Sequence, residues 1–235
     1  YYSELEVMNA KEREEYYNRG LQQQVQYAYE NAPAMRDKLD RAGVKPSDIR
    51  TIKDMEKIPI TTKDQLLDLR KESPPFGGLV AVPREKLPRV YMSPGPIYDV
   101  ESLDDNFLWR MEEALFGLGF RKGDIATNTL TYHMTPAAHW YDEALRRMGI
   151  TVIPMGAGNT DLQIQALHDM QVTGWLGMTG FLMTILTKAE EKGYDIKRDF
   201  ALRVALAGAE MGGEVMRKIF REKYGIRARD LYASA

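Results

Sequence analysis

The second half of the chain alternates short apolar runs with longer amphipathic stretches, most of which end at a glycine. Runs of this length are typical of buried strands, and the periodic stretches are typical of helices. The pattern predicts five strands, at residues 125–130, 150–154, 174–177, 203–207 and 227–232. It predicts four helices between them, at residues 136–148, 161–170, 180–192 and 213–224. Such alternation favours parallel βαβ units, so we predict an α/β fold with an open, mostly parallel sheet flanked by helices.

The first 72 residues predict a helical preface to this sheet. Polar and aromatic residues recur there at helical spacing, and Pro33 interrupts the first pattern. Gly43 is typical of a position just after a helix, while Thr62 with Gln65 forms a capping box at the start of one. We therefore predict four helices, at residues 9–31, 34–42, 51–57 and 63–69.

Residues 73–102 are rich in proline and glycine, which leaves room only for short strands such as 79–82. Within this segment, residues 91–100 hold one glycine between two prolines, which predicts a rigid exposed loop rather than a strand interior. Backbone N–H groups near Ser93 and Gly95 could bind a phosphate, and an ordinary connecting turn is equally compatible with the pattern.

After this segment, Ser102 and Asp105 predict the start of an amphipathic helix that ends near Gly119. The chain then divides into three predicted parts: a helical preface at 1–72, a strand and loop segment at 73–102, and an α/β core at 103–235.

Composition narrows the functional classes. The chain has 235 residues, a formal net charge of −2 and a sequence pI near 6.0, so it has no basic excess for nucleic acid or an anionic membrane. It has no cysteine, which excludes disulfides and thiolate chemistry, and no apolar run long enough to span a bilayer. We expect a cytoplasmic protein. A homodimer through the aromatic first helix is compatible with the sequence, which leaves the oligomeric state open.

Candidate binding residues follow from the predicted sheet. In an open α/β sheet, ligands bind beyond the carboxyl ends of the strands, near the point where strand order reverses. The loops at these ends contain residues with approachable backbone or hydrogen-bonding side chains: Tyr132, His133, Gly156, Gly158, Asn159, Thr179, Gly208 and Glu210. For Gly156 to Asn159, a simple turn with a helix N-cap is an equally good interpretation.

No metal site is predicted, because the three histidines, His133, His139 and His168, lack the spacing of two ligands on one helix face. His133 could orient an acid substrate or make a structural hydrogen bond. A dinucleotide-dependent oxidoreductase is disfavoured, because neither glycine cluster has the spacing of a dinucleotide fingerprint.

Several ordered motifs carry a resemblance to a known family. The chain resembles the large N-terminal domain of phenylacetate-CoA ligases, a branch of the AMP-forming adenylate synthetases, from about residue 31 to its end. The motifs are Asp48-Ile49-Arg50, the run from Ile58 to Leu66, Phe76-Gly77-Gly78-Leu79, Gly123-Asp124, Val152-Ile153-Pro154, Gly208-Ala209-Glu210 and Asp230-Leu231-Tyr232.

This resemblance implies an enzyme that uses ATP, Mg²⁺ and coenzyme A to convert a carboxylic acid, with an aryl acid expected, through an acyl adenylate to an acyl-CoA. It implies nucleotide binding by Gly208, Ala209, Glu210, Asp230 and Tyr232. It implies an acyl pocket formed by Tyr132, His133, Met134, Gly156, Gly158, Thr179 and Gly180. It implies no specific catalytic side chain within this chain.

The phosphate loop departs from the family pattern Ser-Ser-Gly-Thr-Thr-Gly-Lys-Pro. At its place the chain has Met92 to Asp99, where Ser93 and Gly95 remain but the lysine is absent and Asp99 adds a negative charge. The chain also stops before the family's acidic metal-binding residue, its ribose-binding Asp and its C-terminal lid domain. Two hypotheses follow: a ligase with a variant phosphate loop, or a non-catalytic relative that binds an adenylate or acyl-CoA.

Overall fold

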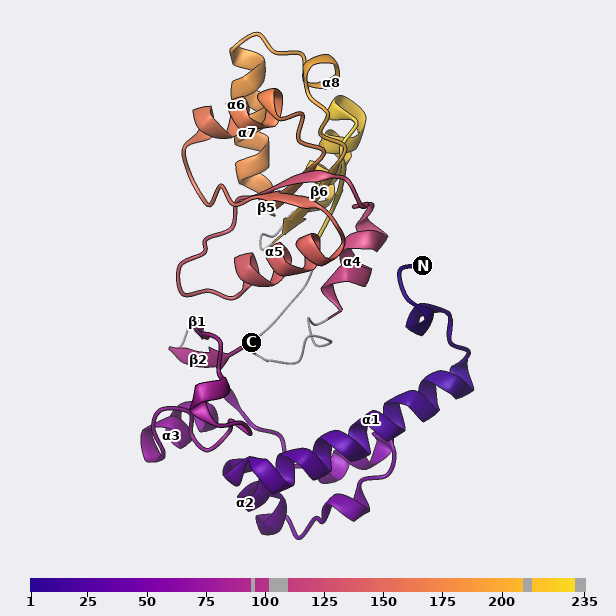
Figure 1. The fold of residues 1–235 in the computed structure, drawn as a ribbon, viewed down its shortest axis with the longest axis vertical. Helices are drawn as coiled ribbons and strands as arrows, with labels where there is room; N and C mark the ends of the chain where they lie inside the picture. Colours follow the sequence, from indigo (N-terminus) through magenta and orange to yellow (C-terminus); the bar gives the residue numbers. More distant parts are fainter. Residues whose placement is uncertain (94–95, 102–109, 209–212, 231–235) are drawn as a thin grey trace. The chain divides into compact units, whose positions relative to one another are not determined.

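The computed structural model describes residues 1–93, 96–101, 110–208 and 213–230, which form two compact units (Figure 1). We call Ser3–Asp105 the helical unit. The sheet unit consists of Tyr1–Tyr2 and Asn106–Ala235.

The sheet unit is built on five parallel strands. These are β3 (Ile125–Asn128), β4 (Thr151–Ile153), β5 (Gly174–Met178), β6 (Val204–Gly208) and β7 (Arg227–Arg229). They lie in the order β4-β3-β5-β6-β7, and every neighbouring pair is parallel. The predicted α/β fold is therefore confirmed. Residues 231–232 of the last predicted strand lie outside the described residues.

Helices cover both faces of this sheet. They are α4 (Met111–Leu118), α5 (Ala137–Arg147), α6 (Thr160–Asp169), α7 (Thr179–Glu191), α8 (Ile196–Asp199) and α9 (Gly213–Ile219), with a π-helical turn η5 (Phe220–Tyr224). Strand β6 separates the two cores, because Val204 and Leu206 pack with α4 and α5 whereas Ala205 and Ala207 pack with α6, α7 and η5. The short helix α8 was not predicted. Residues 102–109 of the predicted helix before α4 lie outside the described residues.

The helical unit confirms most of the predicted preface. It contains α1 (Ala10–Asn31), α2 (Pro33–Arg41) and α3 (Lys63–Glu72), with 3₁₀ turns η1 (Glu4–Val7), η2 (Pro46–Asp48), η3 (Ile52–Lys57) and η4 (Arg84–Lys86). Helix α1 packs along α2, with Val25, Leu39 and Ile49 buried between the elements. The capping box of α3 is present, since the N–H groups of Thr62 and Gln65 donate to each other's side chains at 2.9 and 3.3 Å. The helix predicted at 51–57 is present as the 3₁₀ helix Ile52–Lys57, with Thr51 at its N-cap.

Two predictions for residues 73–102 are wrong. Residues 79–82 are not a strand, and the segment predicted to be a rigid loop contains an antiparallel hairpin of β1 (Val90–Ser93) and β2 (Ile97–Val100). The physical reason is register: Ser93 pairs with Ile97, so Pro96 lies in the turn and its missing N–H removes no bond from the ladder.

Candidate functional site

The strand order defines one reversal point in the described sheet. From β3 the chain crosses first to β4 on one side and then returns past β3 to β5, β6 and β7 on the other. The carboxyl ends of β3 and β5 therefore flank the position where an open α/β sheet binds ligands. The residues that follow these strands are the candidate site.

Asn128, at the end of β3, connects three segments of this rim. Its side chain is completely buried, and its Nδ2 donates to the Ala138 carbonyl at the start of α5 at 2.8 Å. Its Oδ1 accepts from the N–H of Leu130 at 3.2 Å, and its carbonyl accepts from the N–H of Gly156 in the loop after β4 at 3.0 Å. A buried amide with these partners fixes the loops relative to the sheet.

Thr129 extends the contact between β3 and β5. Its backbone N–H and its hydroxyl both donate to the Leu176 carbonyl, at 2.9 and 2.7 Å. The hydroxyl occupies the space above Gly177, where an added Cβ would overlap with it and with the Trp175 ring. Only glycine at position 177 permits this close approach.

Tyr132 is held in place by α5. Its hydroxyl donates to Asp142 Oδ2 at 2.8 Å, and Asp142 Oδ1 accepts from Arg146 Nε at 2.9 Å. His139 lies edge-on to the Tyr132 ring, with centroids 5.2 Å apart, and its Nε2 is 3.1 Å from the Tyr132 carbonyl. Burial, and then the hydrogen bond to Asp142, raise the pKa of Tyr132 well above its ordinary value of 10.0. The phenol is therefore a neutral donor at physiological pH, and its ring has a fixed orientation.

His133 and Met134 are exposed at the tip of the same loop. The N–H of His133 donates to Thr131 Oγ1 at 3.3 Å, and its carbonyl accepts from the N–H of Thr135 at 2.7 Å. Met134 has a φ of 60° and is 52% exposed. Of the three acyl-pocket residues predicted here, only Tyr132 is fixed by side-chain contacts with α5.

The loop after β4 contains the predicted glycines in left-handed conformations. Gly156 and Gly158 have φ of 67° and 85°, and an added Cβ at either position would meet no atom within 4 Å. Asn159 caps α6 by accepting from the N–H of Leu162 at 3.3 Å, as the structural interpretation of this motif predicted. The glycines are thus required by backbone conformation, and open space lies beside them.

Gln163 holds this loop from α6 and was missed from the sequence. It is fully buried, and its Nε2 donates to the carbonyls of Gly156 and Gly158 at 3.0 and 3.4 Å. The sequence signal for its role is its place next to Ile164 on α6, because Ile164 and Leu167 define the core-facing side of this helix. A polar residue at a core-facing helix position is usually hydrogen-bonded to something nearby.

Thr179 begins α7 directly after β5 and is 3% exposed. Its hydroxyl is one of four buried side-chain atoms in the sheet unit that have no hydrogen-bond partner in the described part of the chain: Thr127 Oγ1, Gln163 Oε1, Trp175 Nε1 and Thr179 Oγ1. Gly180 follows, and its carbonyl accepts from Thr184 Oγ1 at 3.0 Å. Unpaired buried groups call for an ordered water or a ligand atom, and the Thr179 hydroxyl is such a group at the carboxyl end of β5.

The predicted nucleotide-binding residues are only partly described. Gly208 is the last residue of β6 and pairs with Met178 at the end of β5. Asp230 forms an ion pair with Arg217 of α9, and an added Cβ at Gly213 would lie 2.8 Å from its Oδ2. Ala209, Glu210 and Tyr232 lie outside the described residues, as does Gly95 of the phosphate-loop equivalent.

The hairpin β1–β2, in the helical unit, carries the remaining predicted residue, Ser93. Arg70 of α3 donates from Nη2 to the Tyr98 carbonyl at 2.6 Å and lies 4.0 Å from Asp99 Oδ1. The negative charge that distinguishes this loop from the family pattern therefore has a cationic neighbour within its own unit.

Across 1–93, 96–101, 110–208 and 213–230, no group of three or more His, Cys, Asp or Glu side chains could hold a metal ion. In those ranges no helix has the length and apolar character needed to cross a membrane.

Comparisons with known proteins agree with the resemblance drawn from the motifs. The chain is 32% identical over 218 residues to a phenylacetate-coenzyme A ligase of Aromatoleum evansii, covering 90% of the chain and 48% of the relative. It is 31% identical over 237 residues to the Escherichia coli enzyme of that name, covering 97% of the chain and 52% of the relative. The chain thus spans about half the length of the curated relatives it matches. No protein-family model matches it.

A solved structure gives the same result for the fold. An open conformation of 2-hydroxyisobutyryl-CoA ligase, in complex with 2-HIB-AMP and CoA, superposes with a TM-score of 0.88 at 25% identity. The match covers 97% of this chain and 51% of that one.

Proposed function

Because the chain is a homologue of phenylacetate-coenzyme A ligases, we propose that the protein containing it is an AMP-forming carboxylic acid–coenzyme A ligase. The observation that carries this proposal is sequence identity of 31–32% spread over 90–97% of the chain, together with a matching sheet. In the first step a carboxylate oxygen attacks the α-phosphate of ATP, so a C–O–P link forms and pyrophosphate leaves. In the second step the sulfur of coenzyme A takes the acyl group, its proton goes to solvent, and AMP leaves.

The rim at β3 and β5 is the proposed acyl and adenylate site. Displacement at phosphorus and at the acyl carbon depends on positioning more than on covalent help from the protein. The proposal is supported by the buried bonds of Asn128 and Thr129, which hold the rim rigidly, and by the fixed ring of Tyr132. The acyl pocket residues remain as the resemblance implies: Tyr132, His133, Met134, Gly156, Gly158, Thr179 and Gly180.

An aryl acid is the proposed substrate class. A tyrosine ring locked by Asp142 and His139 offers a flat apolar wall against which an aromatic ring can stack or pack edge-on. The curated relatives are named for phenylacetate, whereas the solved neighbour is named for a hydroxylated aliphatic acid. An acid panel therefore has to include both types.

ATP and coenzyme A are the proposed co-substrates, with nucleotide binding assigned to Gly208, Ala209, Glu210, Asp230 and Tyr232. Mg²⁺ accompanies ATP in such enzymes. The described residues contain no cluster of three carboxylate or imidazole ligands for it, so we assign it no residue and no step.

The test is carboxylate-dependent exchange of labelled pyrophosphate into ATP by the full-length protein. Phenylacetate, benzoate, 2-hydroxyisobutyrate and acetate are compared, and we expect exchange to be fastest with an aryl acid. Exchange with aliphatic acids alone would disprove the aryl proposal but keep the ligase. Absence of exchange with every acid would disprove the ligase.

A non-catalytic relative is the second candidate, favoured by the sequence of the β1–β2 hairpin. The residues from Met92 to Asp99 lack the lysine and most hydroxyls of the family phosphate loop. This candidate predicts tight binding of AMP or an acyl-CoA, measured by calorimetric titration, without pyrophosphate exchange or thioester formation. Turnover at rates typical of enzymes would exclude it.

A further inference from the structure

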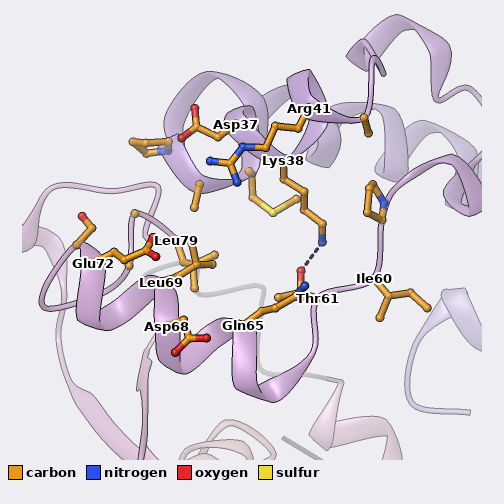
Figure 2. A pocket seen from close by; sticks show the side chains of 18 residues that line it. Asp37, Lys38, Arg41, Ile60, Thr61, Gln65, Asp68, Leu69, Glu72 and Leu79 are labelled. Carbon is orange, nitrogen blue, oxygen red and sulfur yellow. Dashed lines mark hydrogen bonds between the residues drawn. The ribbon is translucent and has the colours of Figure 1, made fainter.

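The helical unit contains a pocket of about 540 Å³ that no part of the proposed function uses (Figure 2). All of its lining residues lie between Pro33 and Leu79, so the pocket belongs wholly to this unit. Its volume falls within the range of small-molecule sites. Helices α2 and α3 form opposite walls, and the segment at Pro59–Thr61 closes one end.

Local structure explains why the pocket stays open. Helix α2 begins at Pro33, and the N–H of its second residue, Ala34, donates to the Gly78 carbonyl at 3.0 Å, which joins the turn after α3 to the start of α2. Helix α3 begins at the Thr62 cap. The start of α2 is therefore bonded to the turn after α3, and the space between the two helices is lined by side chains.

Lys38 is the charged group that faces this space with least access to water. It is half-buried, whereas the other charged lining residues are exposed: Asp37, Arg41, Asp68 and Glu72. Figure 2 shows its ammonium pointing down from α2 to Thr61, whose hydroxyl it contacts. Burial lowers the pKa of Lys38 below its ordinary value of 10.5, and among the residues that the structure describes no carboxylate opposes that effect. The pocket thus holds a partly dehydrated cation whose partner is a neutral hydroxyl.

The rest of the lining combines half-buried apolar residues with exposed charged residues of both signs. Met35, Leu69 and Leu79 are half-buried and line the pocket. Asp68 is 64% exposed and already lies 3.2 Å from Lys71. Exposed carboxylates are solvated and gain little from a ligand cation, but they repel a ligand with several negative charges.

We propose that this pocket binds a small amphipathic monocarboxylate, with the carboxylate at Lys38 and Thr61 and the apolar body against Met35, Leu69 and Leu79. A monoanion supplies the counter-charge that Lys38 lacks, and its apolar part covers half-buried methyl groups. This site is separate from the sheet rim and does not rest on the proposed ligase activity.

Methionine methyl NMR separates the two sites in one experiment on the full chain. Met35 lines the pocket, whereas Met134 and Met178 are exposed at the sheet rim, at 52% and 45%. The chain labelled with [methyl-¹³C]methionine is titrated with phenylacetate, phenylacetamide and phenethylamine, which share a body and differ in head-group charge. We expect saturable shifts of the Met35 methyl with the acid only. Shifts at Met134 or Met178 report the rim independently.

Lys38→Gln is the decisive variant, because glutamine keeps a hydrogen-bond donor for Thr61 but removes the charge. Loss of a charge-assisted hydrogen bond should weaken phenylacetate binding at Met35 about tenfold or more. Lys53→Gln removes the same charge from an exposed position of η3, outside the pocket lining, and should leave the affinity unchanged. Because a dehydrated charge is removed, Lys38→Gln is expected to fold, which dispersed methionine methyl signals would verify.

Three results would overturn the proposal. The first is equal or tighter binding of the amine, which would mean that the exposed carboxylates Asp37, Asp68 and Glu72 determine the charge preference of the pocket. The second is unchanged phenylacetate affinity in Lys38→Gln. The third is absence of a saturable Met35 shift in a chain whose signals show it is folded. None of these bears on pyrophosphate exchange, so the ligase proposal stands or falls separately.

Discussion

The sheet rim and the pocket of the helical unit are built on opposite principles. At the rim, the polar groups that set the geometry are buried and bonded to backbone: Asn128 and Gln163 are fully buried, and Thr129 is 4% exposed. In the pocket, most charged residues are exposed, and only Lys38 is withdrawn from water. The rim is therefore expected to be rigid and sensitive to single-atom changes, and the pocket to respond mainly to charge.

The largest expected effect concerns the carboxyl end of β5. In Gly177→Ala the new methyl group overlaps with the Thr129 hydroxyl and the Trp175 ring, so Thr129 loses its bond to Leu176. Overpacking and a buried Thr129 hydroxyl without its acceptor together should lower the free energy of unfolding by about 3 to 4 kcal/mol. Displacement of the rim should also reduce pyrophosphate exchange by about 100-fold. Urea unfolding and the exchange assay measure the two effects.

Gly174→Ala is the matched control at the amino end of the same strand. Its methyl group would overlap with the buried Phe120 ring, so a comparable loss of stability is expected. Position 174 is at the edge of the sheet opposite the rim, so exchange activity should persist at temperatures where the variant is folded. Equal loss of activity in both variants would mean that the rim has no special role.

The second prediction compares two asparagines, one in each region. Asn128→Ala removes a buried side chain that bonds to Ala138 and Leu130, and should cost about 2 kcal/mol because the Leu130 N–H loses its acceptor and a cavity replaces the amide. In the helical unit, Asn18 Oδ1 accepts from the N–H of Ile52 at 3.0 Å in an exposed setting. Asn18→Ala should change stability by less than about 0.5 kcal/mol, because water replaces the bond and alanine favours helix. Similar costs would remove the distinction between the regions.

The sequence predicted the rim far better than the pocket. Parallel strands leave a regular apolar pattern, and the rule for open sheets then places the loops at 131–135 and 155–160 at one edge without further information. What the pattern could not reveal was which polar side chains are buried. Asparagine and glutamine are usually surface residues, but Asn128 and Gln163 are buried where β3, the loop after β4 and α6 pack together.

The errors in residues 73–102 have a different origin. A proline disfavours a strand only where the ladder needs its missing N–H. Register decides this, and Pro96 lies in the turn of the hairpin. Lys38 on α2 contacts Thr61, which lies just before α3 and 23 positions later in the chain. No periodic sequence pattern predicts such a contact. The shape of a pocket between short helices depends on tertiary contacts at the helix ends, such as the bond from the Ala34 N–H to the Gly78 carbonyl.

Raising the pH through the alkaline range should change the stability contributions of Tyr132, at the rim, and Lys38, in the pocket, in opposite directions. The folded pKa of Tyr132 is raised above 10.0, so the unfolded state releases this proton first and stability falls as pH rises above 10.0. The folded pKa of Lys38 is lowered below 10.5, so the unfolded state holds this proton longer and stability rises with pH up to 10.5.

Tyr132→Phe and Lys38→Gln isolate these contributions. Urea unfolding of each variant and of the wild type is compared from about pH 8 to about pH 11. The advantage of the wild type over Tyr132→Phe should shrink above pH 10, while any disadvantage of the wild type relative to Lys38→Gln should shrink on approach to 10.5. Parallel changes in both pairs would contradict the opposite electrostatics assigned to the rim and the pocket.

The smallest expected effect tests whether the two units unfold separately. Gly20 lies in the middle of α1, and a Cβ there would meet no atom within 4 Å, so Gly20→Ala should stabilise this helix by about 0.5 to 1 kcal/mol. All three tryptophans, at positions 109, 140 and 175, belong to the sheet unit. With independent units, Gly20→Ala should move the transition seen by far-UV circular dichroism while leaving the tryptophan fluorescence transition in place. Equal movement of both signals would show that the helical unit and the sheet unit unfold as one, and a change at the pocket could then reach the rim through stability alone.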